Sequence, residues 1–184
     1  MNCYCGSGLN FEDCCNLFIQ AQQTPDTAEQ LMRSRFSAYC DGSAIAVHYI
    51  ANSYHPVSKA DNPINEIATF AQAAHFVRLD VITASSLLPL PDDIRQSMPE
   101  HSPQIGSSFS TVHFKVQFIM QDKLHLLEEK SRFIKNNQQW AYLDGFLTDH
   151  PPQKLSRNDS CPCQSGKKYK NCMPHRAAGQ PLSK

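Results

Sequence analysis

The stretch that decides the fold class is FSTVHFKVQFIM, residues 109–120. Apolar and polar side chains alternate along it, and a period of two is typical of a strand with one buried face. The side chains predicted to face the core are Val112, Phe114, Val116, Phe118 and Met120. Those predicted to point the other way are His113, Lys115 and Gln117.

Weaker strand patterns lie on both sides of this segment. Residues 77–81 alternate upstream, and residues 124–134 and 140–146 follow downstream, joined by a short turn at 135–138. A proline-rich connection, residues 89–106, separates the first pattern from the central one. Its length predicts a mobile loop or lid. This half of the chain is therefore predicted to form an antiparallel sheet.

Helical spacing precedes the strands. The first helix is predicted to begin at Thr24, as an N-cap followed by proline, and to end at Gly42. Residues 43–55 and 62–74 predict two more helices. Cys40 on the first helix is expected to be a core residue. Helices followed by a run of strands predict an α+β fold, with the helices packed on one face of a curved antiparallel sheet.

One cysteine pattern occurs at both ends of the chain. The two copies are CYCGSGLNFEDCC, residues 3–15, and CPCQSGKKYKNC, residues 161–172. They hold seven of the eight cysteines: Cys3, Cys5, Cys14 and Cys15 in the first, Cys161, Cys163 and Cys172 in the second. A glycine-containing turn after each first pair lets the chain reverse, so that later thiolates reach the same ion. Because zinc takes four ligands at tetrahedral corners, both segments are predicted to be zinc knuckles.

Disulfides are the alternative use of these cysteines. Residues 1–20 lack a basic start and a long apolar stretch, so we expect a cytoplasmic chain with free thiols. In the second copy, Met173 stands where the first has Cys15, and a thioether is a poor zinc ligand. His175 is the predicted fourth ligand, with a loosely binding three-thiolate site as the alternative.

The formal net charge is zero but unevenly spread. Residues 151–184 carry seven basic residues and one acidic residue, whereas residues 24–150 carry ten basic and fourteen acidic. The basic segment 151–184 either keeps the protein soluble or forms a contact surface for phosphate or an acidic protein. The candidate contact residues are Lys167, Lys168, Tyr169 and Lys170. No apolar run approaches the roughly 18 residues of a membrane span.

A sheet curved around helices often encloses a cone-shaped pocket. The candidate polar groups for it are Arg33, Arg35, His55, Arg132, Tyr142 and Asp144. A histidine–aspartate pair among them could act as an acid/base dyad. The alternative is that arginine and aspartate pair structurally and that His55 sits at a helix end.

Residues 158–172, NDSCPCQSGKKYKNC, closely resemble the SEC-C motif. That motif forms the zinc-binding tail of the preprotein translocase ATPase SecA, where it docks the chaperone SecB. The whole chain resembles the YchJ-type family of uncharacterised bacterial proteins, which have a SEC-C knuckle at each end and a nuclear-transport-factor-2-like domain between. The other matching stretches are LMRSRFSAY at 31–39, HP at 55–56, SRF at 131–133 and WAYLDG at 140–145. The chain departs from the family pattern at Gln164, usually glycine, and at Met173, usually cysteine or histidine.

Three units are therefore expected: an N-terminal knuckle at residues 1–22, a middle domain at 24–150, and a C-terminal knuckle with a basic tail at 151–184. Each knuckle is expected to fold on its zinc, separately from the middle domain. The predicted function is that of a zinc-containing adaptor for protein partners, such as an acidic chaperone or a secretion-related protein. The alternatives are an enzyme or small-ligand binder that uses the pocket, and nucleic-acid binding through the basic knuckle.

Overall fold

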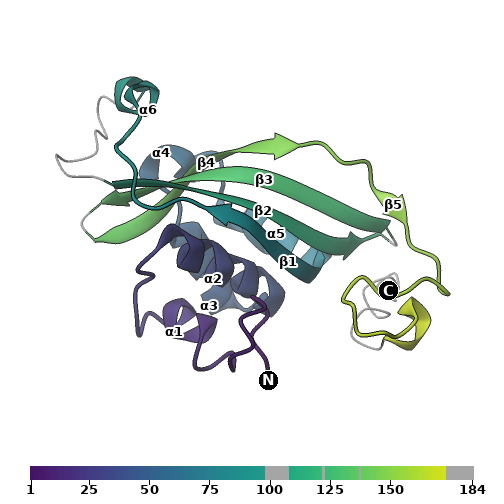
Figure 1. The fold of residues 1–184 in the computed structure, drawn as a ribbon. Coiled ribbons are helices and arrows are strands. Elements are labelled where there is room, and N and C mark those ends of the chain that lie inside the picture. The colour runs from purple at the N-terminus through teal and green to yellow at the C-terminus, as the bar shows by residue number, and fades with distance from the viewer. Residues whose placement is uncertain (98–107, 122, 137, 173–184) are drawn as a thin grey trace.

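The computed structural model describes residues 1–97, 108–121, 123–136 and 138–172. Its centre is an open, curved antiparallel sheet in the order β1-β2-β3-β4, with a short β5 paired to one end of β3 (Figure 1). The strands are β1 (His75–Ala84), β2 (Ser108–Met120), β3 (Lys123–Asn136), β4 (Gln139–Thr148) and β5 (Gln153–Lys154). The predicted α+β class is confirmed.

The helices are α1 (Cys15–Ile19), α2 (Ala28–Asp41), α3 (Ala44–Asn52), α4 (Pro56–Lys59), α5 (Ile64–Ala73) and α6 (Asp92–Ser97). A 3-10 turn, η1, spans Tyr169–Asn171. The three helices predicted before the sheet are present. The first begins later than predicted, because Thr27 rather than Thr24 caps it by accepting a hydrogen bond from the Gln30 amide at 3.1 Å. Gly42 ends it as predicted, in the left-handed conformation with φ 63°.

Two helices were not predicted. Pro56 does not only end the second helical region; it begins α4, since proline fits the first turn of a helix. Helix α6 lies within the connection predicted to be a loop, and Ile94, which is 1% exposed, packs it against Phe109 and Ile134. The remainder of that connection, residues 98–107, lies outside the described residues.

The core forms where α2 crosses the sheet. The alternation of β2 is confirmed: Val112, Phe114, Val116 and Phe118 are buried, and Met120 is half-buried. They pack with Leu31, Met32 and Phe36 of α2 in one cluster. This packing leaves the helix-facing side of the sheet as the place where a central cavity can form.

The two ends of the chain lie at different places on this body. The N-terminal segment sits beneath α2 and α3, whereas the C-terminal segment lies at the far end of the sheet, beyond β5 (Figure 1). Among the described residues, no helix has the length and apolar character needed to cross a lipid bilayer.

Candidate metal centres and the central cavity

The two cysteine segments adopt the same local backbone. The Cys3 amide donates to the Leu9 carbonyl at 2.7 Å, and the Cys161 amide donates to the Lys167 carbonyl at 2.8 Å. One isolated bridge closes each loop, between residues 2 and 10 and between residues 160 and 168. The sequence repeat is therefore also a structural repeat.

The turn in each loop needs left-handed backbone at two positions. In the first copy these are Gly6 (φ 79°) and Gly8 (φ 80°), and in the second Gln164 (φ 58°) and Gly166 (φ 73°). Glycine adopts such angles without steric cost, but a residue with a Cβ does not. The C-terminal knuckle is therefore strained at Gln164 in a way that the N-terminal knuckle is not.

The four N-terminal cysteines form a cluster suited to a metal ion. Their sulfur atoms all lie within 4.8 Å of one another. Cys5 Sγ is 3.8 Å from Cys14 Sγ, which is 4.0 Å from Cys15 Sγ. Sulfur ligands about 2.3 Å from a tetrahedral ion such as zinc lie about 3.8 Å apart, whereas a disulfide needs about 2.0 Å. The arrangement therefore fits a bound cation, and the eight cysteines, all within the described residues, form no disulfide.

The thiols of a cluster differ in pKa because they share hydrogen bonds: side-chain hydrogen bonds with Cys15 and Cys5 lower the pKa of the Cys3 thiol. Hydrogen bonds with Cys3 and Cys5, and then burial, raise the pKa of the Cys15 thiol. Burial raises the pKa of the Cys161 thiol in the second cluster to about 12. A divalent cation reverses this balance, since it binds the thiolate form and deprotonates its ligands.

Arg33 fastens the N-terminal knuckle to α2. Its Nη1 donates to the Cys5 carbonyl at 2.8 Å, while its Nε donates to Glu29 at 2.8 Å. Cys3 Sγ also lies 3.6 Å from the Ser37 hydroxyl. Arg33, predicted to be a pocket residue, therefore serves the knuckle instead.

The N-terminal knuckle shares its apolar packing with the helices. Its buried residues Cys3, Cys5, Phe11, Cys15 and Ile19 belong to one cluster with Ala46, Val47 and Ile50 of α3. The expectation that both knuckles fold apart from the middle domain stays a prediction, but this knuckle packs against that domain. The apolar residues around the cysteines are the physical reason, because they complete the outer surface of the helix layer.

The C-terminal cluster brings three described cysteines together. Cys163 Sγ lies 3.4 Å from Cys161 Sγ and 3.7 Å from Cys172 Sγ. The Ser165 hydroxyl lies 3.7 Å from Cys172 Sγ, as the Ser7 hydroxyl lies 3.4 Å from Cys14 Sγ. The predicted fourth ligand, His175, and Met173 lie outside the described residues.

The C-terminal knuckle is mounted on the end of the sheet. Cys161, Tyr169 and Cys172 pack with Ile119 of β2 in a separate small cluster. Tyr169, predicted to contact a partner, is only 6% exposed because it occupies the same buried position as Phe11 in the first copy. Lys167 and Lys168 are exposed, and Lys170 is half-buried.

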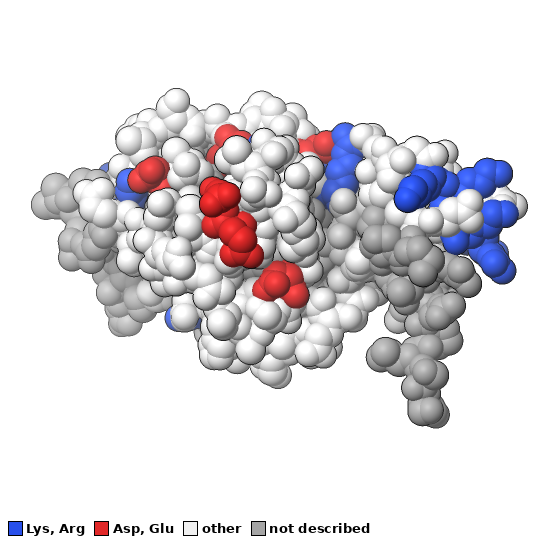
Figure 2. Space-filling model, turned by 90° about the horizontal axis from the view of Figure 1, so that it is seen from below, with Lys and Arg blue, Asp and Glu red and all other residues white. Residues whose placement is uncertain are grey.

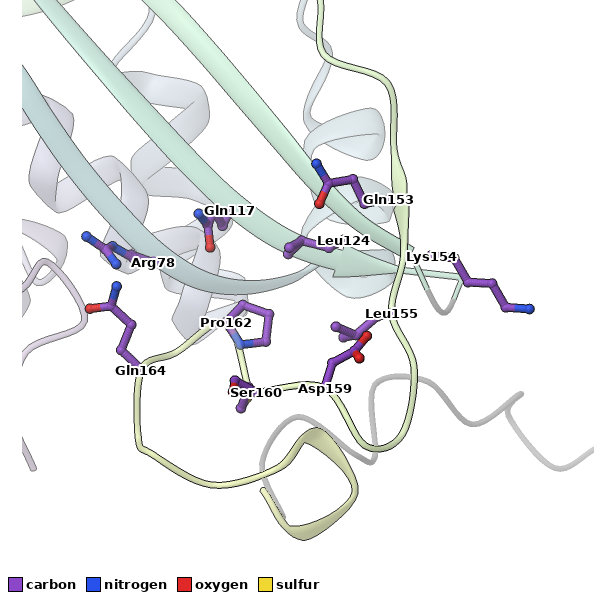
Figure 3. Close-up of a pocket in the computed structure, with 11 residues that line it drawn as sticks. Arg78, Gln117, Leu124, Gln153, Lys154, Leu155, Asp159, Ser160, Pro162 and Gln164 are labelled. Atoms are coloured by element: carbon purple, nitrogen blue, oxygen red, sulfur yellow. The ribbon is translucent and has the colours of Figure 1, made fainter.

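A polar groove of about 390 Å³ marks the junction between this knuckle and the sheet. Figure 3 shows Pro162 and Gln164 of the knuckle on one side of it and Arg78 and Gln117 of the sheet on the other. Arg78 is held by Asp80, with its Nη2 2.6 Å from Oδ1.

A cavity of about 310 Å³ lies between α2 and the sheet. Of the six predicted pocket residues, Arg35 and Tyr142 line it. Arg132 instead forms a bidentate pair with Asp144 across β3 and β4, in which Nε donates to Oδ1 and Nη2 to Oδ2, both at 2.5 Å. His55 caps α4, where its Nδ1 accepts from the Val57 amide at 3.4 Å. His55 and Asp144 are not among the residues that line this cavity. The histidine–aspartate dyad therefore stays a prediction, while these contacts are those expected of the structural alternative.

Five polar cavity residues were missed in the sequence: Tyr39, Tyr54, Asn62, Glu129 and Ser131. A signal for Glu129 was present, because it shares the parity of Leu127 and Phe133 on β3 and so falls on the core-facing side. Tyr39 also had one, since it lies at helical spacing from Arg35 and Phe36 on α2, whereas no signal of this kind marks Tyr54.

Comparisons with known proteins cover nearly the whole chain. Residues 27–93 and 93–145 match the model described as YchJ, middle NTF2-like domain, and residues 157–172 match the SEC-C motif. A UPF0225 protein of Vibrio cholerae is 35% identical over 94% of this chain and 99% of its own length. One of Photorhabdus laumondii is 36% identical over 92% of this chain and 96% of its own.

Two solved structures are similar. A SEC-C motif containing protein from Rhodopseudomonas palustris superposes with a TM-score of 0.64 at 25% identity, covering 81% of this chain and 100% of that one. Another from Psychrobacter arcticus has a TM-score of 0.59 at 24% identity, covers 94% of this chain and 95% of that one, and supports the fold alone.

Proposed function

Since this chain belongs to the UPF0225 family, with a YchJ-type NTF2-like middle domain and a SEC-C motif, we propose that it is a zinc-dependent interaction protein. In this proposal the N-terminal zinc is structural and completes the helix layer. The C-terminal zinc orders a basic surface that docks an acidic segment of a protein partner. A reducing compartment such as the cytoplasm keeps the thiols available for metal.

The observation that carries the proposal is the division of the C-terminal knuckle into a buried side and a basic side. Its cysteines and Tyr169 face the end of the sheet, with Cys161 and Cys172 each 4% exposed. Five basic side chains within positions 151–172 form the surface called here the basic face: Lys154, Arg157, Lys167, Lys168 and Lys170. Figure 2 shows basic side chains gathered at this end of the molecule, away from the acidic side chains on its body.

The charge of the basic face is poorly neutralised within the knuckle. Asp159 is the one acidic residue of residues 151–172, and its Oδ2 already accepts the Ser156 amide at 2.7 Å. Three thiolates with one zinc subtract only one further charge, so the surface stays positive. Long-range attraction of this kind raises association rates with acidic partners and weakens as salt rises.

A rigid mount lowers the cost of binding. Zinc and the packing against Ile119 fix the backbone that carries Lys167 and Lys168, so less conformational entropy is lost when a partner docks. A free basic tail has the same charge but none of this order. Zinc dependence is therefore the property that separates docking from nonspecific attraction.

The experiment uses the zinc-loaded full chain and a fluorescent oligoglutamate peptide as the acidic probe. The variant Lys167→Glu/Lys168→Glu reverses two exposed charges of the basic face, and Lys59→Glu/Lys130→Glu is the matched control at exposed sites elsewhere. We expect binding by the wild type and the control, loss in the first variant, and at least about tenfold weakening by a chelator.

Equal binding by the two charge-reversal variants would contradict the proposal, and so would binding that a chelator leaves unchanged. A single-stranded oligonucleotide serves as the second probe. If it binds the wild type about tenfold or more tightly than the peptide at the same salt, the nucleic-acid alternative replaces the adaptor. The tail gives this alternative little support, because Tyr169 is buried and cannot stack on bases.

A further inference from the structure

The central cavity has the size and lining of a small-molecule site. Its volume of about 310 Å³ falls in the range of such sites, about 300–1,000 Å³. Leu147 lines it and is 69% exposed, which places the opening beside this residue. Eight aromatic side chains contribute to the wall: Phe36, Tyr39, Tyr54, Phe70, Phe76, Phe114, Phe133 and Tyr142.

Arg35 also lines the cavity, and contacts within the protein stabilise its charge. It is 8% exposed, and its Nη1 donates to the Ile50 carbonyl at 3.2 Å and to the Ser53 hydroxyl. Its guanidinium lies 4.3 Å from the Tyr54 ring centroid and 4.9 Å from that of Tyr142. Within the described part of the chain it forms no ion pair. Its positive charge is thus stabilised by carbonyl, hydroxyl and ring faces.

The carboxylate of Glu129, in contrast, has one oxygen that accepts no hydrogen bond from the described residues. The residue is 9% exposed, and its Oε1 accepts from the Tyr142 hydroxyl at 2.9 Å and from the Ser131 hydroxyl at 2.5 Å. Among the described residues no donor is bonded to its Oε2. This oxygen is not among the atoms that are both buried and unpaired, so it is open to the cavity, where the donor of a ligand can reach it.

Gly145 makes room for this carboxylate. A Cβ at position 145 would lie 2.0 Å from Glu129 Oε1, so any larger residue would displace the side chain. The glycine stands on β4 opposite Ser131, which donates to the same oxygen. Three positions of the sheet thus cooperate to hold one carboxylate at the cavity.

We propose that the cavity binds a neutral, planar aromatic molecule that donates an N–H or O–H group to Glu129 Oε2, as an indole or a phenol can. A planar ring suits the aromatic wall through stacked and edge-to-face contacts. One guanidinium and one carboxylate make the cavity formally neutral, so an ionic ligand would bring an unbalanced charge into an apolar space. This site is separate from the zinc knuckles and goes beyond the adaptor function.

The test uses the zinc-loaded full chain and two probes, indole and 1-methylindole, measured by calorimetric titration. The probes differ by the single N–H donor. We expect indole to bind with a Kd below about 1 mM and 1-methylindole to bind about tenfold more weakly, since the hydrogen bond to a charged acceptor is lost. In Glu129→Gln the preference for indole should fall to about threefold or less, because the acceptor is then neutral.

A second variant keeps the test decisive even if Glu129→Gln fails to fold. Leu147→Trp fills the opening at an exposed position and should abolish indole binding, whereas Leu87→Trp, at a site 64% exposed and away from the cavity lining, should not. Absence of indole binding to the wild type overturns the proposal. Equal affinity for the two probes does so as well, and so does indole binding that Leu147→Trp leaves unchanged.

Discussion

Replacing Gln164 with glycine should strengthen the C-terminal metal site. Gln164 holds φ 58° at the position where the N-terminal knuckle has Gly6 at φ 79°. A residue with a Cβ in this conformation costs about 1–2 kcal/mol. Glycine's greater freedom in the unfolded chain offsets about 0.5–1 kcal/mol of the gain. We therefore expect Gln164→Gly to stabilise the folded knuckle by about 0.5–1 kcal/mol.

Metal binding and folding of such a small unit are coupled, so the gain appears in the affinity for zinc. About 0.5–1 kcal/mol corresponds to about two- to fivefold tighter binding. The assay is competition between the full chain and a chromophoric chelator, which separates the weaker site from the stronger one. Gly6→Ala is the mirror variant: no atom lies within 4 Å of the added Cβ, so its effect on the N-terminal site is the backbone cost alone.

One further variant separates backbone strain from side-chain contacts. Gln164 also lines the groove between the knuckle and the sheet, so its side chain could contribute to stability. Gln164→Ala removes that side chain but keeps the Cβ and the strain, and should not tighten binding. If Gln164→Gly leaves the affinity unchanged or weakens it, the argument from left-handed backbone is refuted.

Three other changes have defined outcomes. Arg33→Ala removes the hydrogen bond to the Cys5 carbonyl and the ion pair with Glu29 on α2. It should lower the free energy of unfolding, measured by denaturant titration, by about 1–2 kcal/mol. An effect near zero would show that these two contacts do not stabilise the fold. The hydrogen bond from His150, together with those from His113 and Lys115, lowers the pKa of Glu128 to about 2. A carboxylate whose pKa is lower in the folded state stabilises the fold above its unfolded pKa of about 4.5. The difference in unfolding free energy between wild type and Glu128→Gln should therefore be full at pH 6 and shrink as the pH falls from about 4.5 toward 2. A difference that stays constant over this range contradicts the assignment. Gly145→Ala should lower the melting temperature because its Cβ meets the Glu129 carboxylate, and adding Glu129→Ala should recover part of the loss, so a strictly additive double mutant would contradict the contact.

Local patterns predicted the elements well where one residue type decides the geometry. The alternation around Phe114 predicted the central strand and its buried face, and Gly42 predicted a helix end. Both signals can be seen in the sequence, because a period of two marks a strand and glycine readily adopts positive φ. Thr24 and Thr27 look alike as caps. Gln30 distinguishes them, since its amide reaches the Thr27 hydroxyl while its side chain accepts the Asp26 amide at 2.7 Å.

Contacts between distant segments were beyond the same reasoning. Arg33 carries the same charge as Arg35 two positions later, but the helix turns one toward the knuckle and the other into the cavity. The sequence predicts that Tyr169 is exposed, because lysines surround it. Only its packing against Ile119 in the structure shows that it is buried. The cysteine clusters were predictable because ligand spacing constrains the loop around an ion, whereas the cavity depends on how α2 crosses the sheet.

The most direct test of the account is the mass of the intact chain under native, reducing conditions. Two clusters of thiolates, one with four sulfur ligands and one with three described ligands, predict a mass increase of about two zinc ions per chain, falling to about one in Cys163→Ser. A chain that carries no metal contradicts the proposal for both knuckles, and one that carries a single zinc contradicts the C-terminal site. A mass lower by pairs of hydrogen atoms, with no metal, would show that the cysteines form disulfides instead.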